Sequence, residues 1–328
     1  MRREVRRFEA RVASADSYLL GEGPVWDAER ERLLWVDINA GHVFEGRLAG
    51  DSVHVDRRHE FGETVGAVVC DRDGRLLVAG RKGLLTVAGG DEPGRPSGAG
   101  DGGPSASGGE RDERGERAYL VDLIPEGKDS RLNDGACDPG GRFLVGSLAL
   151  DDRHGQEFLY RYETDGTVTT LDTDLALSNG LAWSPDLSTM YSVDSVPRTI
   201  WTRAYDAVTG AYGERRVLLE VSDGTPDGLC VDVDGNLWLA LWGAGQVRGY
   251  SPRGEHLATV EVAAPNVTSV AFVGPRLDTL LITSARVGMT PADAARHPDA
   301  GRVFLADVGT RGLATPYWSG PAARRIPE

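Results

Sequence analysis

The sequence has little positive charge, few cysteines and no long apolar run. Its 36 lysine and arginine residues stand against 50 aspartate and glutamate residues, which gives a formal net charge of −14. Nucleic acids and anionic membranes both require a basic protein face, so neither is expected as a partner. Three cysteines cannot all pair, and none stands in a C-x-x-C spacing, so we expect reduced thiols. No stretch has the length of a signal-peptide core or a membrane span, and we therefore expect a cytoplasmic protein.

Two common catalytic signatures are also missing. No Gly-x-Ser-x-Gly occurs, which argues against a serine hydrolase with a nucleophile elbow. The six histidines show no metal-ligand spacing, and we expect most of them on the surface or in loops. Helix signals are nearly absent, and PADAARHP (residues 291–298) is expected to form at most a short helical turn.

What the sequence does contain is a repeat. A small residue, an alternating apolar strand, a turn and a second apolar strand recur along the chain. The six copies begin at Glu22, Val65, Asp134, Asn179, Asp227 and Thr268. Their first residues are 43, 69, 45, 48 and 41 positions apart. The longest interval contains residues 89–117, which are almost free of apolar side chains, so we expect a flexible insert there; without it the interval is 40.

A repeat of this length, with paired strands, predicts an all-β fold: a six-bladed β-propeller with four-stranded antiparallel blades. One blade cannot bury both of its faces, so residues 1–328 should form a single domain. A division into two domains would need a linker, and the only candidate lies inside one repeat. The N-terminal strand RRFEARV (residues 6–12) should close the ring as the outer strand of the last blade.

Propeller geometry would bring the first residues of the repeats together, because the first strand of each blade lines the central channel. Glu22, Asp134, Asn179 and Asp227 should therefore converge at one end of the channel, with Asn133 beside them. Three carboxylates there would repel one another, and a bound cation is the natural remedy. Donors that are all oxygen favour a hard divalent ion such as calcium, magnesium or manganese.

Turn formation is the alternative explanation for any one of these residues. Asn-Gly and Asp-Gly are ordinary turn sequences, and we expect Asp73-Gly74, Asp138-Pro139-Gly140 and Asp234-Gly235 in hairpin turns. The recurrence of polar residues at equivalent repeat positions favours a site over a set of unrelated turns.

Several motifs resemble one known family. They are, in chain order, LGEGPVWD, RLNDGACDPGGRFLVGSL, LSNGLAWSPD, PDGLCVDVDGNLWLALWGAGQV and SARVGM. In order and spacing they are similar to the family of gluconolactonases, regucalcin (senescence marker protein) and related sugar lactonases. The resemblance runs from about Gly21 to the segment GRVFLADVGTRGLATPY and covers nearly the whole chain, although the insert does not belong to the pattern.

The resemblance implies a six-bladed propeller with one divalent metal ion in the channel, calcium being favoured and magnesium, manganese or zinc being alternatives. It implies that Glu22, Asn179 and Asp227 hold the metal. Asn133 would lie beside the metal and the substrate. Arg131 would contact hydroxyl or carboxyl oxygens of a sugar acid lactone, with bracing of a turn as its alternative role.

Three further residues are expected near the substrate. Asp134 neighbours Asn133, and Asp151 or Asp152 stands where mammalian members of the family have a glutamate. That difference bears on which lactone is bound. Trp242 either packs a blade interface or covers a sugar ring.

These residues predict hydrolysis of a sugar lactone such as gluconolactone to the sugar acid. A hard cation would polarise the lactone carbonyl, and Asp227 would orient or deprotonate the attacking water. Two alternatives stay open: a metal-dependent phosphotriesterase or other esterase on the same site, and a non-catalytic propeller that binds metal. Comparing the turnover of gluconolactone with that of an aryl phosphotriester distinguishes a lactonase from a phosphotriesterase. Absence of metal-dependent hydrolysis across a broad lactone panel would favour the non-catalytic propeller. The sequence leaves the oligomeric state unknown.

Overall fold

The structure is a computed structural model that describes residues 4–88, 117–151 and 153–321. The expected insert at residues 89–117 lies, apart from Arg117, outside the described residues, and so does Asp152.

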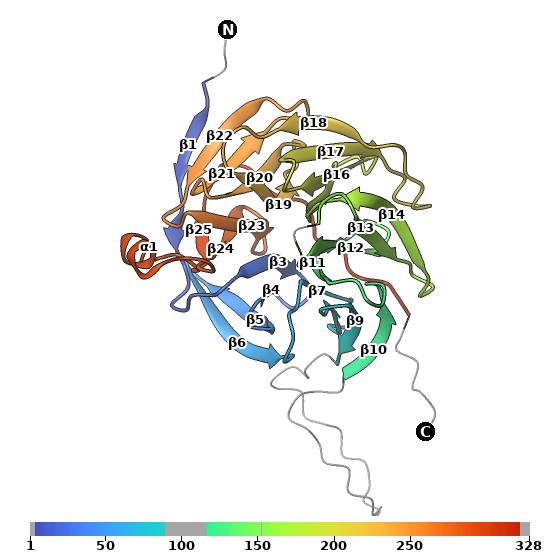
Figure 1. Ribbon diagram of the computed structural model, residues 1–328. Coiled ribbons are helices and arrows are strands. Elements are labelled where there is room, and N and C mark those ends of the chain that lie inside the picture. Colours follow the sequence, from blue (N-terminus) through green and yellow to red (C-terminus); the bar gives the residue numbers. More distant parts are fainter. Residues whose placement is uncertain (1–3, 89–116, 152, 322–328) are drawn as a thin grey trace, which may run out of the picture.

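The strands form six blades arranged in a ring, with β3, β7, β11, β19 and β23 near its centre (Figure 1). Blades 1 to 4 are separate four-stranded sheets in which consecutive strands pair antiparallel. The predicted fold class is therefore confirmed. The strands of these blades are β3 (Gly21–Asp27), β4 (Arg32–Asp37), β5 (His42–Ala49) and β6 (Ser52–Glu60); β7 (Ala67–Cys70), β8 (Leu76–Ala79), β9 (Gly83–Val87) and β10 (Arg117–Asp122); β11 (Ser130–Cys137), β12 (Phe143–Ala149), β13 (Glu157–Tyr162) and β14 (Val168–Leu175); β15 (Ser178–Trp183), β16 (Thr189–Asp194), β17 (Thr199–Ala204) and β18 (Arg216–Glu220).

Blades 5 and 6 are joined at one point, where Trp242 pairs with Asn266 across the boundary between β20 and β23. Hydrogen bonding therefore runs through both blades as one nine-stranded sheet. The strands of blade 5 are β19 (Thr225–Val231), β20 (Leu237–Trp242), β21 (Gln246–Tyr250) and β22 (His256–Glu261). Those of blade 6 are β23 (Asn266–Val273), β24 (Thr279–Ala285), β25 (Phe304–Ala306) and β2 (Arg11–Val12).

The N-terminal segment closes the ring, but it does so with two short strands. β2 (Arg11–Val12) pairs antiparallel with β25 and completes blade 6, as expected. Residues 6–9 differ from the expectation: they form β1 (Arg6–Glu9), which pairs parallel with β22 at the edge of blade 5. Without the N-terminal segment, the outer strands β22 and β25 would leave backbone N–H and C=O groups unpaired. The segment pairs first with β22 and then with β25, and so covers the edges of both blades.

The core consists of six apolar clusters, one between each pair of neighbouring blades. Alternate side chains of a strand point to opposite faces of its sheet. In β4, Leu33 and Trp35 therefore pack against blade 6, while Leu34 and Val36 pack against blade 2. Because each blade buries both faces, its central strands carry runs of apolar residues, as residues 33–36 in β4 do.

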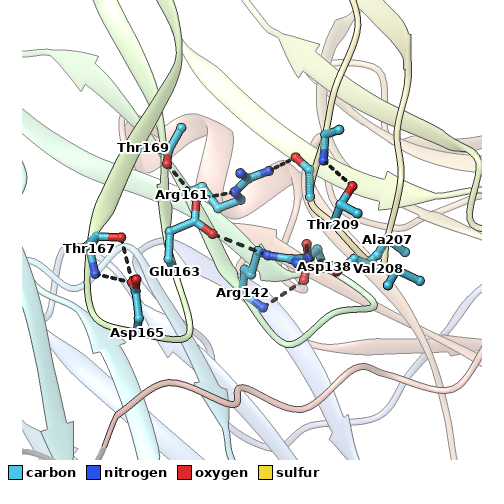
Figure 2. Close-up of polar contacts among 12 residues, drawn as sticks. Asp138, Arg142, Arg161, Glu163, Asp165, Thr167, Thr169, Ala207, Val208 and Thr209 are labelled. Atoms are coloured by element: carbon cyan, nitrogen blue, oxygen red, sulfur yellow. Dashed lines mark hydrogen bonds and ion pairs between the residues drawn. The ribbon is translucent and has the colours of Figure 1, made fainter.

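A polar network fastens the turns of blades 3 and 4 at the end where the innermost strands finish (Figure 2). Arg142 donates from Nη1 to Asp138 Oδ2 over 2.8 Å and from Nη2 to the carbonyl of Val208 over 2.8 Å. Its Nε lies 3.3 Å from Glu163 Oε2. Asp138 belongs to the hairpin turn between β11 and β12, as predicted, and its carboxylate is taken up by this network.

The remaining features are small. The helix in the described ranges is α1 (Pro291–Arg296), which Thr290 and Asp293 cap reciprocally. Among the residues described, none of the helices could span a membrane. The three cysteines are free thiols, as expected.

Candidate functional site

The innermost strands lose their regular register where the expected site residues lie. The shifts fall between Glu22 and Val25, Leu132 and Gly135, Asn179 and Leu181, Pro226 and Leu229, and Val267 and Val270. A bulge inserts an extra residue and turns its side chain away from the alternation of the strand. The bulges thus direct side chains from blades 1, 3, 4 and 5 into the channel.

Glycines next to the site residues let the innermost strands approach closely. A Cβ added at Gly180 would lie 2.6 Å from the carbonyl oxygen of Asp227 and 3.0 Å from the backbone nitrogen of Leu229. A Cβ at Gly228 would lie 2.1 Å from Ser269 Oγ. Neither space admits a side chain, so the repeated pattern of a polar residue followed by glycine reflects strand packing as well as turn formation.

Two cavities occupy the channel, one at each end. The first cavity, of about 290 Å³, lies where the innermost strands begin. The second cavity, of about 230 Å³, lies where they finish, and its wall is mostly apolar. The lining of the first cavity is Leu20, Glu22, Ile38, Arg131, Asn133, Leu148, Leu177, Asn179, Ser195, Thr225, Asp227 and Trp242.

Two buried carboxylates stand together in the first cavity. Glu22 is 5% exposed and Asp227 is 7% exposed. Burial raises the pKa of both groups well above the ordinary range. Repulsion from Asp227 and Asp134 raises the pKa of Glu22 further, and repulsion from Asp134 does the same for Asp227. The pair is therefore a place where a positive charge would be stabilised.

Arg131, Asn133 and Asn179 surround this pair. Arg131 is buried, and desolvation lowers its pKa to about 10. Its Nη1 donates to Asn133 Oδ1 over 2.7 Å. Asn133 Nδ2 in turn donates to Asn179 Oδ1 over 3.0 Å. The three side chains are held by one another, so the guanidinium and both carboxamides face the cavity in fixed orientations.

The structure separates the expected substrate residues into three groups. Arg131, Asn133 and Trp242 line the first cavity with the expected metal ligands. Asp134 lines the second cavity instead, where its Oδ1 accepts from the backbone N–H of Gly135 over 2.8 Å. Asp151 is exposed and forms an ion pair with Arg153 outside both cavities.

The position of Trp242 is compatible with both roles that the sequence left open, packing at a blade interface and covering a sugar ring. Its backbone pairs with Asn266 of the next blade, and its partly exposed side chain lines the first cavity.

Sequence reasoning missed Ser195, which lines the first cavity and is 2% exposed. The residue before it, Asp194, carries a repeat signal that could have drawn attention to this position. Asp194 and Asp37 occupy equivalent places in the repeats, and each accepts backbone N–H bonds from residues just before an innermost strand: Asp194 from Leu177 and Asp37 from Leu20, for example. Each aspartate fixes the start of an innermost strand through these backbone bonds. Ser195, the residue after Asp194, lines the cavity as a result.

The oxygen atoms in the first cavity fit a hard divalent cation. The expected donors are the carboxylates of Glu22 and Asp227 and the carboxamide oxygen of Asn179. Arg131 supplies one positive charge nearby, which cannot neutralise both buried acids when they are ionised. In the described ranges, no group of three or more His, Cys, Asp and Glu side chains is arranged to hold a metal. The expected set differs from such a group because its third member is an amide.

Comparisons with known proteins identify the family of the chain. Residues 20–286 match the family described as SMP-30/Gluconolactonase/LRE-like region. The pentonolactonase XacC of Haloferax volcanii is 34% identical over 302 residues, which cover 89% of this chain and 92% of that protein. Regucalcin of Danio rerio is 31% identical over 304 residues, covering 91% and 94%.

Solved structures give the same result. The crystal structure of a calcium-binding protein, regucalcin, from Agrobacterium tumefaciens superposes with a TM-score of 0.82 at 28% identity, covering 96% of this chain and 98% of that one. The resemblance carried by the sequence motifs is therefore confirmed over almost the full length. The chain belongs to the SMP-30/gluconolactonase/LRE-like family of β-propellers.

Proposed function

We propose that this protein is a divalent-cation-dependent lactonase that opens a sugar lactone to the corresponding sugar acid. One observation carries the proposal: a buried pair of carboxylates, Glu22 and Asp227, lies beside the guanidinium of Arg131 in a small cavity at the channel mouth. A cavity of about 290 Å³ is near the lower end of the size range of ligand pockets, about 300 Å³, and suits a single sugar ring. The relationship to a pentonolactonase supports the substrate class.

Glu22, Asn179 and Asp227 would hold the cation, for which calcium is the favoured candidate and magnesium, manganese or zinc are alternatives. When bound, a divalent ion supplies Lewis acidity that polarises an ester carbonyl and stabilises the developing oxyanion.

The protein's own groups perform the other parts of the reaction. Asp227, which lines the cavity, would orient a water molecule and accept its proton as the water attacks the lactone carbonyl. The acyl C–O bond of the ring then breaks, and the proton passes to the ring oxygen, which leaves as a hydroxyl group of the sugar acid. Arg131 offers guanidinium donors to hydroxyl or carboxyl oxygens of the sugar, and its bond to Asn133 fixes its direction. Trp242 and the apolar side chains of Leu148 and Leu177 would restrict water around the ring.

The matched pair Asp227→Asn and Asp234→Asn tests the proposal. Asp227→Asn keeps the shape of the side chain but removes a charge and a base, so kcat for lactone hydrolysis should fall by roughly two or more orders of magnitude. Asp234 is exposed in the hairpin turn of the same blade, where asparagine serves equally well, and its variant should keep a rate near that of the wild type. Rates are measured at saturating calcium, because the first change also weakens cation binding.

Equal losses in the two variants, or wild-type turnover in Asp227→Asn on the best lactone substrate, would show that the first cavity is not the catalytic site.

A further inference from the structure

Ser195 is a buried residue at the cavity whose hydroxyl group connects two blades. It follows the last residue of β16 in blade 4, and its Oγ donates to the carbonyl oxygen of Pro226 in β19 of blade 5 over 2.7 Å. The same oxygen accepts from Asn179 Nδ2 over 2.9 Å. Ser195 therefore joins the side chain of one expected metal ligand to the backbone just before another, Asp227.

These contacts belong to a chain of four hydrogen bonds that crosses blades 3, 4 and 5. The bonds run from Arg131 to Asn133, from Asn133 to Asn179, from Asn179 to Ser195, and from Ser195 to the carbonyl of Pro226. Each donor points in the same direction along the chain.

The two ends determine this direction without ambiguity. A guanidinium can only donate, and a backbone carbonyl can only accept. The carboxamides between them must therefore present oxygen toward Arg131 and nitrogen toward Pro226, although oxygen and nitrogen of an amide are otherwise interchangeable in shape. Because the single proton of Ser195 is used on Pro226, its lone pairs are free to accept from Asn179.

We infer that Ser195 is a positioning residue that, together with Asn133 on the other side of the amide, holds the Asn179 carboxamide with Oδ1 toward the cavity, and so prepares that oxygen for a cation. The inference rests on the proposed function in one respect, the identity of the ligand. Without the Ser195 hydroxyl, Asn179 Nδ2 would lose its acceptor, and the carboxamide could turn its nitrogen toward the cation. A group that orients a metal ligand in this way typically contributes about 10- to 100-fold to affinity or activity.

The test is calcium affinity, measured by calorimetry on the full chain for the wild type, Ser195→Ala and a matched control, Ser284→Ala. Ser284 is 1% exposed and donates to the carbonyl of Arg302 over 2.7 Å, so its variant loses the same kind of buried bond away from both cavities. Ser195→Ala should weaken calcium binding roughly tenfold or more. Ser284→Ala should leave the affinity unchanged.

A double-mutant cycle shows whether Ser195 acts through Asn179. In an Asn179→Ala background, Ser195→Ala should cause no further loss of affinity, because the group it positions is gone. Wild-type affinity in Ser195→Ala would overturn the inference, and so would an equal loss in both backgrounds.

A second measurement separates this inference from the proposed function. If the wild type binds no calcium, the cation in the proposed function is wrong, and the positioning role is then judged by hydrogen exchange of the Asn179 side-chain amide in cation-free protein. Loss of the acceptor should speed this exchange in Ser195→Ala and not in Ser284→Ala. Unchanged exchange in Ser195→Ala would overturn the inference.

Discussion

Replacing Asp134 by asparagine should stabilise the cation-free protein at neutral pH and change little near pH 4. Burial raises the pKa of Asp134 from 3.8 to about 6. The folded protein therefore holds a proton that the unfolded chain releases between about pH 4 and pH 6, so this carboxyl group stabilises the fold below that window and the contribution is lost as the pH rises through it. Asparagine has no such charge and can still accept the N–H of Gly135.

The size of the effect follows from the shift. A change of about 2 pKa units at 1.36 kcal/mol each corresponds to about 3 kcal/mol at pH 7. With an unfolding entropy of about 2.1 cal/mol/K per residue, a chain of 328 residues should gain about 4 °C in Tm. Removal of this charge also lessens the repulsion on Glu22 and Asp227, which acts in the same direction.

The assay is thermal unfolding in chelator between pH 4 and pH 7, with wild type, Asp134→Asn and the exposed control Asp234→Asn. The difference in Tm between Asp134→Asn and wild type should grow from near zero at pH 4 to about 4 °C at pH 7. Saturating calcium should narrow it, because a bound cation attracts the carboxylate of Asp134. A difference that is absent at pH 7, or that is the same at both ends of the range, would refute the reasoning.

Two further predictions concern the chain outside the carboxylates. Deletion of residues 90–116 should leave solubility, Tm and lactone hydrolysis almost intact, because their composition is too polar and glycine-rich for a blade core; loss of soluble protein would contradict this. Gly180→Ala should destabilise the protein by about 1–3 kcal/mol in urea unfolding, since the added Cβ meets the backbone of Asp227 at 2.6 Å. Gly213→Ala, whose Cβ would lie 3.5 Å from Ala204, should change stability by less than about 0.5 kcal/mol, and equal costs would speak against close strand approach as the cause.

The architecture could be predicted from the sequence because a propeller repeats one local pattern. A short apolar run such as that from Leu33 to Val36 buries side chains on both faces of a blade, and such runs recur visibly in the sequence. The division of the N-terminal segment into β1 and β2 was not predicted. It depends on which blade edges are left unpaired, and a strand of two residues carries too little pattern to show its partner.

The candidate site could be predicted in part. The repeat positions of Glu22, Asn179 and Asp227 indicated that these residues share one cavity, and the structure brings them together. Asp134 starts a repeat in the same way, yet it lines the other cavity, because the register shift between Leu132 and Gly135 turns Asn133 and Asp134 toward different cavities. Its charge still acts on Glu22 and Asp227.

Ser195 shows a second limit of the sequence. A serine after a strand is common, and its importance comes from contacts with Asn179 and Pro226, which lie 16 and 31 positions away in the chain. The first contact lies within blade 4 and the second crosses to blade 5, and neither has a periodic signature in the sequence, so the geometry was needed to find them.

The most direct test of the whole account is the initial rate of hydrolysis of aldonolactones by the purified protein before and after removal of divalent ions. The account predicts hydrolysis of at least one sugar lactone, little turnover of an aryl phosphotriester, loss of most activity in chelator, and recovery to different degrees with calcium, magnesium and manganese, because oxygen ligands discriminate weakly among hard ions. Full activity in metal-free protein would contradict the role given to the cation, and no hydrolysis across a broad lactone panel with each ion would contradict the proposed function itself.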